Sequence, residues 1–239
     1  MNEIEKTGQA EFDFAAPNPA QKEPSALPPF LRQEGFYFVA LGGAEKVGMN
    51  MYAYISDGRI IVVDAGYDFL NDDFPGMELG LADPAWLESY RDCIDAKFIT
   101  HLHEDHFGAI AHIWPRLRCP VYATDFTIGH ILPRLREYKL ENEVELISVN
   151  QNPVVKLPDF EVEYVPVVHS LPENSALRIK TKYGTVFHAT DWRFDDCHID
   201  FMKTSYDRLK QVGEQGVDLY VGDSIHMAHP VEQPSEMVI

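Results

Sequence analysis

The stretch FITHLHEDHFGAI, residues 98–110, is the feature that most constrains how this chain can fold. The apolar run AKFIT, residues 96–100, is typical of a short buried strand, and three histidines and two acidic residues follow within positions 101–106. Apolar residues then recur at helical spacing from position 107 to position 117. The chain must therefore contain a buried strand that ends in imidazole and carboxylate groups and leads directly into a helix.

These polar residues have the spacing of metal ligands. Residues two apart in a strand point the same way, so His101 and His103 can face one point as the chain leaves the sheet. Asp105 and His106 lie at the turn into the helix and can face a second point nearby. Imidazoles and carboxylates at a rigid sheet edge suit zinc, manganese or iron, and two ions would lie about 3.5–4 Å apart, as in dinuclear hydrolases. Glu104 is expected beside the site or facing solvent.

Four further polar residues each follow an apolar strand: Asp64 after RIIVV, His169 after EYVPVV, Asp191 after TVFHAT and Asp223 after VDLYVG. Sheet proteins build their sites at strand ends. Taken alone, such a residue is more often a turn former or a cap. Together with the cluster at 101–106, however, the pattern predicts His169 and Asp191 as ligands. Asp191 is our candidate for a carboxylate that bridges two ions.

Three other histidines are weaker candidates. His188 precedes Asp191 by three positions and can point near the site, although we expect it to pack in the core. His226 and His229 have two interpretations, as late ligands or as parts of a flexible C-terminal tail, and the second is favoured.

Composition excludes several classes of protein. The 239 residues, of which 45% are hydrophobic, suffice for one sizeable core. A net charge of −18 disfavours non-specific attraction to nucleic acid or anionic lipid. No apolar run approaches the roughly 20 residues that span a bilayer, and the N-terminus has no secretory pattern. Cys93, Cys119 and Cys197 are not paired as CxxC, which favours reduced thiols and a cytoplasmic protein without membrane contact.

We expect three segments along the chain. Residues 1–34 are rich in proline and form a mobile N-terminal extension, with an arm packed on the domain as the alternative. Residues 35–225 form one domain, and residues 226–239 form a C-terminal tail. Within the domain, strands come first, helices are interleaved and strands return. This order fits a layered α/β sandwich better than an all-parallel doubly wound sheet.

At its HLHEDH motif the sequence resembles the metallo-β-lactamase superfamily, whose signature is HxHxDH. More narrowly it is similar to the N-terminal part of the ribonuclease J family, in the β-CASP branch. The similar stretches follow the family's order over about residues 37–224. They are ALGGAEKVGMNMYAY, IIVVDAG, ITHLHEDHFGAI, PVYAT, VVHSLPENSALRI, TVFHATDWRFDD and VDLYVGDS.

The resemblance implies a four-layer αββα metallo-β-lactamase sandwich with two Zn²⁺ per chain, or Mn²⁺ as the alternative metal. It assigns three imidazoles to one ion, a carboxylate and an imidazole to the other, and one carboxylate to both. These residues are His101, His103 and His169; Asp105 and His106; and Asp191.

The resemblance also implies roles outside the ligand set. Asp64 would orient the ligands through hydrogen bonds. Asp223 matches the acidic residue at which the family's β-CASP domain begins, and we expect Asp105 and Asp223 to be catalytic. The sequence departs from the family after Asp223. The β-CASP insertion and the C-terminal completion of the fold, with a further histidine ligand, are lacking before Ile239, which indicates a fragment or a reduced relative.

Three functions are compatible with these observations. The first is a zinc-dependent hydrolase resembling ribonuclease J, which would cleave RNA phosphodiesters as an endonuclease or 5′-3′ exonuclease with a hydroxide held by two metals. The second is a stand-alone hydrolase of small esters, thioesters or lactones. The third is a truncated, inactive metal-binding domain that serves as a partner in a larger assembly. RNA is the expected partner of the first, and homo- or hetero-oligomers stay open.

Overall fold

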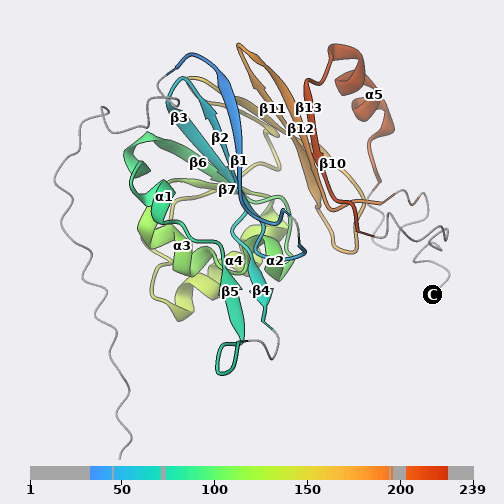
Figure 1. The fold of residues 1–239 in the computed structure, drawn as a ribbon. Coiled ribbons are helices and arrows are strands. Elements are labelled where there is room, and N and C mark those ends of the chain that lie inside the picture. Colours follow the sequence, from blue (N-terminus) through green and yellow to red (C-terminus); the bar gives the residue numbers. More distant parts are fainter. Residues whose placement is uncertain (1–32, 45, 71–73, 194, 196–202, 226–239) are drawn as a thin grey trace, which may run out of the picture.

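The computed structural model describes residues 33–44, 46–70, 74–193, 195 and 203–225 (Figure 1). The segment expected as a C-terminal tail, 226–239, lies outside the described residues, as does all but the last two residues of the expected N-terminal extension. His226 and His229 are therefore not placed. Among the described residues, no helix is long and apolar enough to cross a bilayer.

The first sheet has six strands in the order β1-β2-β3-β6-β7-β8. The strands β1, β2 and β3 form an antiparallel meander, whereas β3, β6, β7 and β8 run parallel. The carboxyl ends of β3 and β6 and the beginning of β2 therefore lie at the same sheet edge. The strand bounds are Phe36–Gly42 (β1), Met51–Ser56 (β2), Arg59–Val63 (β3), Ile94–Phe98 (β6), Val121–Ala123 (β7) and Leu146–Ser148 (β8).

The second sheet has five strands in the order β13-β12-β11-β10-β9. Strands β9 to β12 are antiparallel, and β13 pairs parallel with β12. Hairpin β11–β12 has the short turn at residues 182–183. The bounds are Val154–Lys156 (β9), Glu161–Pro166 (β10), Ser175–Thr181 (β11), Gly184–Thr190 (β12) and Leu219–Gly222 (β13).

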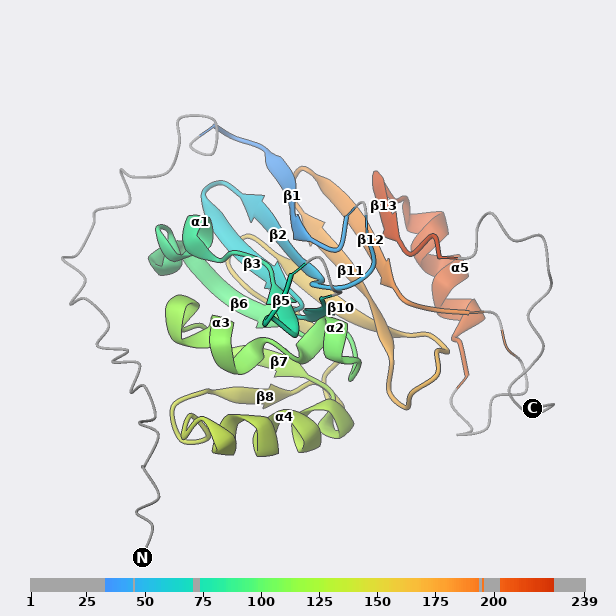
Figure 2. The same ribbon diagram turned by 60° about the horizontal axis from the view of Figure 1, so that its bottom comes forward.

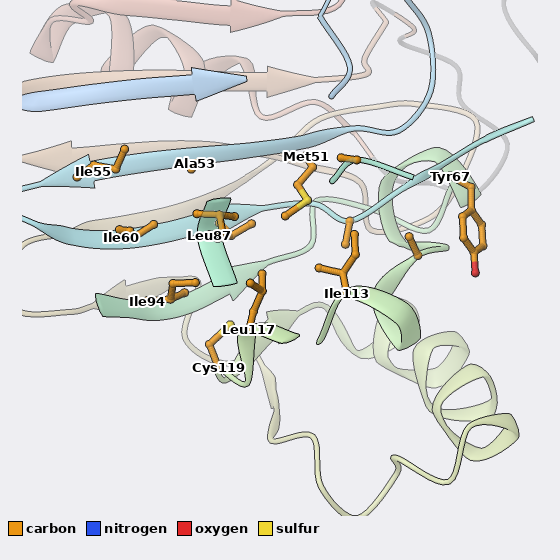
Figure 3. Close-up of a cluster of buried hydrophobic side chains, with 14 residues drawn as sticks. Met51, Ala53, Ile55, Ile60, Tyr67, Leu87, Ile94, Ile113, Leu117 and Cys119 are labelled. Carbon is orange, nitrogen blue, oxygen red and sulfur yellow. The ribbon is translucent and has the colours of Figure 1, made fainter. Parts of the chain in front are cut away.

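Helices cover the outer face of each sheet (Figures 1 and 2). On the first sheet, Leu87 of α1 and Ile113 of α3 belong to one apolar cluster with Ile60 and Met51 of the sheet (Figure 3). A second cluster fills the space between the sheets, and Val212 of α5 packs on the outer face of the second sheet. The predicted four-layer αββα sandwich is thus confirmed. The helices are α1 (Ala85–Glu88), α3 (Ile110–Leu117), α4 (Asp125–Glu137) and α5 (Tyr206–Gln215).

After α1 the chain forms a 3₁₀ turn, Arg91–Cys93. The helix expected over residues 107–117 is interrupted in the structure. The segment is divided into α2 (Glu104–Phe107) and α3, because the carbonyl groups of Asp105 and His106 accept hydrogen bonds from outside the helix. The carbonyl of His106 accepts from Ala65 N at 2.6 Å, and Ala109 N donates to Ala65 O at 2.8 Å. The end of β3 therefore interrupts the helix and holds its first turn. The hairpin of β4 (Tyr67–Phe69) and β5 (Leu79–Leu81) was not predicted.

Lys97 of β6 is an unusual core residue. It is fully buried, and its ammonium group donates to the carbonyl of Asp64 at 3.2 Å. Burial lowers its pKa from 10.5 to about 8, because the charged form loses its hydration. The side chain lies where β3 and β6 lead into the residues predicted as ligands.

Lys97 makes the stability depend on pH in a defined direction. Between about pH 8 and pH 10.5 the unfolded chain holds a proton on this lysine that the folded chain has released, so stability rises with pH. The full rise corresponds to about 3 kcal/mol. We therefore expect the free energy of unfolding, measured with urea in the presence of a chelator, to increase from pH 7.5 to pH 10. The increase should be larger for the natural chain than for Lys97→Met. Equal increases in both chains would contradict the assignment.

Candidate metal centre

The predicted ligands come from the ends of strands in both sheets. His101, His103, Asp105 and His106 follow β6 of the first sheet. In the second sheet, His169 lies in the loop between β10 and β11, and Asp191 follows β12 directly. The two sheets pack face to face, and these segments meet at one edge of the sandwich.

A first group of donors contains His101, His103, His169 and Asp191, with one donor atom from each within 4.8 Å of the others. His103 Nδ1 lies 3.0 Å from His101 Nε2 and 3.1 Å from His169 Nε2. Asp191 Oδ2 lies 3.7 Å from His169 Nε2. Ligand atoms around a tetrahedral zinc with 2.0–2.1 Å bonds are about 3.3 Å apart. The donor types and their separations fit such an ion.

A second group consists of Asp105, His106 and Asp191. His106 Nε2 lies 3.5 Å from Asp105 Oδ2 and 3.5 Å from Asp191 Oδ2. Asp191 therefore belongs to both groups, and its carboxylate is placed where it can serve two ions. The structure thus brings together all six residues that the sequence predicts as ligands.

The imidazoles differ in their protonation. Burial lowers the pKa of His101 well below 6.5, lowers that of His103, and lowers that of His169 to about 4. These three rings are neutral at pH 7 and can donate electron pairs to a cation. Burial also acts to lower the pKa of His106, but the carboxylates of Asp64 and Asp191 outweigh it and raise this pKa to about 10. A cation that binds His106 must displace a proton.

Asp64 is hydrogen-bonded to the segment that carries the predicted ligands. Its side chain is fully buried, and Oδ1 accepts from Thr100 N at 2.9 Å. Oδ2 lies 2.8 Å from His106 Nδ1, which leaves Nε2 of that ring facing the second group. The hydroxyl of Thr100 lies 3.0 Å from His101 Nδ1 and leaves Nε2 of that ring facing the first group. Hydrogen bonds to the second ring nitrogen are the usual way in which proteins orient metal-binding histidines.

The sequence analysis missed Asn50 at the beginning of β2. Its Nδ2 lies 3.2 Å from Asp105 Oδ2 and 3.1 Å from His106 Nε2, and its Oδ1 accepts from Tyr52 OH at 2.8 Å. The predicted ligands all follow strands, whereas Asn50 precedes one. Because β2 is antiparallel to β3, the beginning of β2 lies at the edge where β3 ends. The polar residue before the apolar stretch MYAYIS is the sequence signal that indicates this position.

Other candidates lie as follows. His188 is buried beside the rings of Tyr52 and Tyr54 and shares a 2.9 Å hydrogen bond with Tyr54 OH, in agreement with the expected packing role. Burial lowers its pKa to about 4. Glu104 forms an ion pair of 2.6 Å with Arg134.

Gly66 allows the close contact that holds the ligand turn. A Cβ atom at this position would lie 1.5 Å from the carbonyl oxygen of Asp105. That carbonyl accepts from Asn50 N at 2.9 Å, so the backbone of the turn is fixed against β2 and β3. Any larger residue at position 66 would displace the turn that carries Asp105 and His106.

A cavity of about 360 Å³ opens beside the second group. Asp105, His106 and Asp191 line it together with Asp223, although Asp223 belongs to neither donor group. Asp223 Oδ1 accepts from Ile225 N at 2.6 Å. A small molecule or one unit of a polymer would fit this volume, and it would contact the acidic residues predicted as catalytic.

The family follows from comparison with known proteins. Residues 59–212 match the model of the beta-lactamase superfamily domain. The chain belongs to the beta-lactamase superfamily. Two solved structures agree in fold, both at 18% identity. They are a metallo-beta-lactamase fold protein, YhfI from Bacillus subtilis (TM-score 0.51, 71% of this chain and 67% of that one), and a protein of unknown function from Enterococcus faecalis V583 (TM-score 0.53, 83% and 52%).

Within this superfamily, the chain is similar to proteins named ribonuclease J. It is 38% identical over 209 residues to one from Sinorhizobium meliloti, covering 86% of this chain and 37% of that protein. It is 32% identical over 200 residues to one from Helicobacter pylori, covering 83% and 29%. The predicted resemblance is confirmed. The chain spans about a third of the length of these relatives.

We propose that Asp64 orients the ligands, and this role predicts a loss of metal affinity in Asp64→Asn. Asparagine keeps the volume of the side chain, and its Oδ1 can still accept from Thr100 N. Its Nδ2 replaces the carboxylate oxygen Oδ2, so His106 Nδ1 loses its charged acceptor. We expect zinc affinity to fall about ten- to a hundredfold, as measured by competition with a chromophoric chelator. Asp92→Asn, an exposed change at the opposite end of β6, is the control. Equal affinities in the two variants would exclude this role.

Proposed function

We propose that this chain carries a zinc-dependent centre that cleaves RNA phosphodiester bonds, by endonuclease or 5′-3′ exonuclease action, with Mn²⁺ as the alternative metal. The observation that carries the proposal is the pair of donor groups that share Asp191. The similarity to proteins named ribonuclease J over 86% of the chain supports RNA as the substrate.

The chain's own residues would hold the ions in a fixed arrangement. His101, His103 and His169 would bind one ion with neutral imidazoles, Asp105 and His106 the other, and Asp191 both. When bound, two divalent cations lower the pKa of a coordinated water toward neutrality and neutralise charge on phosphate oxygens. Because Asp64 and Thr100 hold the ligand rings before any ion binds, little reorganisation is needed.

The cavity would receive the scissile bond. Asp105 and Asp223 place carboxylates at its wall, where they can accept or return a proton as a leaving oxygen departs. Lys46 also lines the cavity, but its ammonium group is paired with Asp68 at 2.5 Å. With a chain charge of −18, the bound cations would supply the positive charge that a phosphate needs.

A second function is favoured by the same cavity. Its volume of about 360 Å³ fits a small ester, thioester or lactone, and such a substrate needs no extended basic surface. A carbonyl substrate would use the same ligands and the same carboxylates. The two functions differ in substrate class, and one assay separates them.

We expect the metal-loaded chain to cleave 5′-monophosphorylated RNA, and Asp191→Asn to lower the rate at least about a hundredfold by removing the shared ligand. Gel analysis of labelled RNA, with chelator-treated protein and Asp92→Asn as controls, provides the measurement. Turnover of a small ester with RNA left intact would favour the second function. Bound zinc without turnover of either substrate would indicate a metal-binding domain without activity.

A further inference from the structure

The donor groups combine residues from both sheets, and the second sheet supplies His169 and Asp191. His169 does not lie on a strand. It is carried by the loop at 167–174, between β10 and β11. A loop side chain must be held by contacts of the loop itself if it is to meet ligands from the first sheet within hydrogen-bond distance. Two consecutive residues at the end of this loop, Glu173 and Asn174, make contacts of this kind.

Asn174 joins the loop to the segment that carries Asp191. Its side chain is almost completely buried, at 1% exposure. Nδ2 donates to the carbonyl of Asp191 at 2.8 Å and to the carbonyl of Val167 at 3.4 Å. The backbone carbonyl of Asn174 accepts from Val167 N at 3.1 Å and closes the base of the loop. One amide group therefore connects both ends of the His169 loop to the backbone of Asp191.

The orientation of this amide is determined by its surroundings. Among the described residues, Asn174 Oδ1 is buried without a hydrogen-bond partner. A flipped amide would place that oxygen against two carbonyl oxygens and lose both hydrogen bonds. The donor must therefore face Asp191, and a carboxylate at position 174 would repel the same two carbonyls.

Glu173 joins the loop to the opposite layer. Its Oε2 accepts from the backbone N–H of Phe126 at 3.0 Å, in the first turn of α4. Its Oε1 accepts from Asn150 Nδ2 at 3.3 Å, just beyond β8 of the first sheet. An anion at a helix N-terminus is favourable. The backbone of Glu173 has φ +57°, a left-handed conformation that only fixed surroundings maintain in a non-glycine residue.

Neighbouring residues thus connect the loop to both halves of the sandwich. Glu173 bonds to the α4 and β8 side of the first sheet, and Asn174 bonds to the end of β12 in the second. The next residue continues the pattern, because Ser175 N donates at 3.3 Å to the carbonyl of Thr100, which precedes His101.

We propose that Glu173 and Asn174 are positioning residues that hold His169 and Asp191 against the ligands of the first sheet, and thereby set the affinity and the geometry of the first metal position. Neither belongs to a donor group, and neither lines the cavity beside the second group. They act through the backbone of the residues that do. The inference rests on the proposed metal centre, but it concerns cation binding and is independent of which substrate is cleaved.

Cobalt titration of the full chain tests the proposal, because the visible absorption of Co²⁺ reports both its affinity and its coordination geometry. Asn174→Asp keeps the size of the side chain and adds a negative charge, which by attraction alone would strengthen cation binding. We expect Co²⁺ binding to be ten- to a hundredfold weaker instead, with an altered absorption spectrum. Asn174→Ala and Glu173→Ala should shift the affinity in the same direction. Asn142→Asp, in the exposed turn after α4, adds the same charge away from the loop and is the matched control.

Urea unfolding in the presence of a chelator identifies the variants that fold. If Asn174→Asp does not fold, the neutral alanine variants test the positioning role. Folded variants that bind Co²⁺ with unchanged affinity and an unchanged spectrum would overturn the positioning role, even if they were less stable. A natural chain that binds no Co²⁺ would instead refute the proposed metal centre on which the role rests. RNA that stays uncut by a cobalt-binding chain would leave the positioning role intact.

Discussion

The packing of the two sheets against each other is the constraint on which the metal centre depends. Each sheet supplies donors that the other lacks, so the site exists only where the sheets are held at a fixed distance. Tyr54 and Phe98 of the first sheet and Val162 and Leu177 of the second are completely buried between them. Burial of each large apolar side chain contributes roughly 1.5–3 kcal/mol. Tyr164 adds a directional contact between the sheets, because its hydroxyl donates to the carbonyl of Tyr122 at 2.9 Å.

The edge of the sandwich is arranged in detail by local backbone conformation. Asp64 and Thr190 have φ of 60° and 55°, which are uncommon for residues other than glycine and a marked departure for a β-branched threonine. Each ends a strand, and each is adjacent to or bonded with the predicted ligands. Strained residues of this kind persist where the surrounding contacts over-determine them, and they collect at functional sites. Thr100 connects the two, because its hydroxyl oxygen lies 3.1 Å from the hydroxyl of Thr190 and 3.0 Å from Asp64 Oδ2.

Much of this arrangement could be predicted from sequence, because ligand spacing and strand ends are local properties. The HLHEDH motif, the apolar strands and the polar residues that follow them were enough to predict the fold class and to select the six residues that converge. Contacts between distant segments could not be predicted in this way. The role of Asn50 depends on the antiparallel pairing of β2 with β3, and the helix break at Ala109 depends on a bond to Ala65. In the sequence, Glu173 and Asn174 are ordinary loop residues. Their contacts with α4 and with the end of β12 become evident only in the folded structure.

The central claim is that donors from both sheets surround a pair of divalent cations. Anomalous diffraction at the zinc absorption edge, from crystals of the zinc-loaded chain, tests it most directly. The account predicts two peaks about 3.5–4 Å apart, one in contact with His101, His103 and His169, the other with Asp105 and His106, and Asp191 between them. Zinc bound elsewhere on the surface, with no peak at this edge of the sandwich, would contradict it.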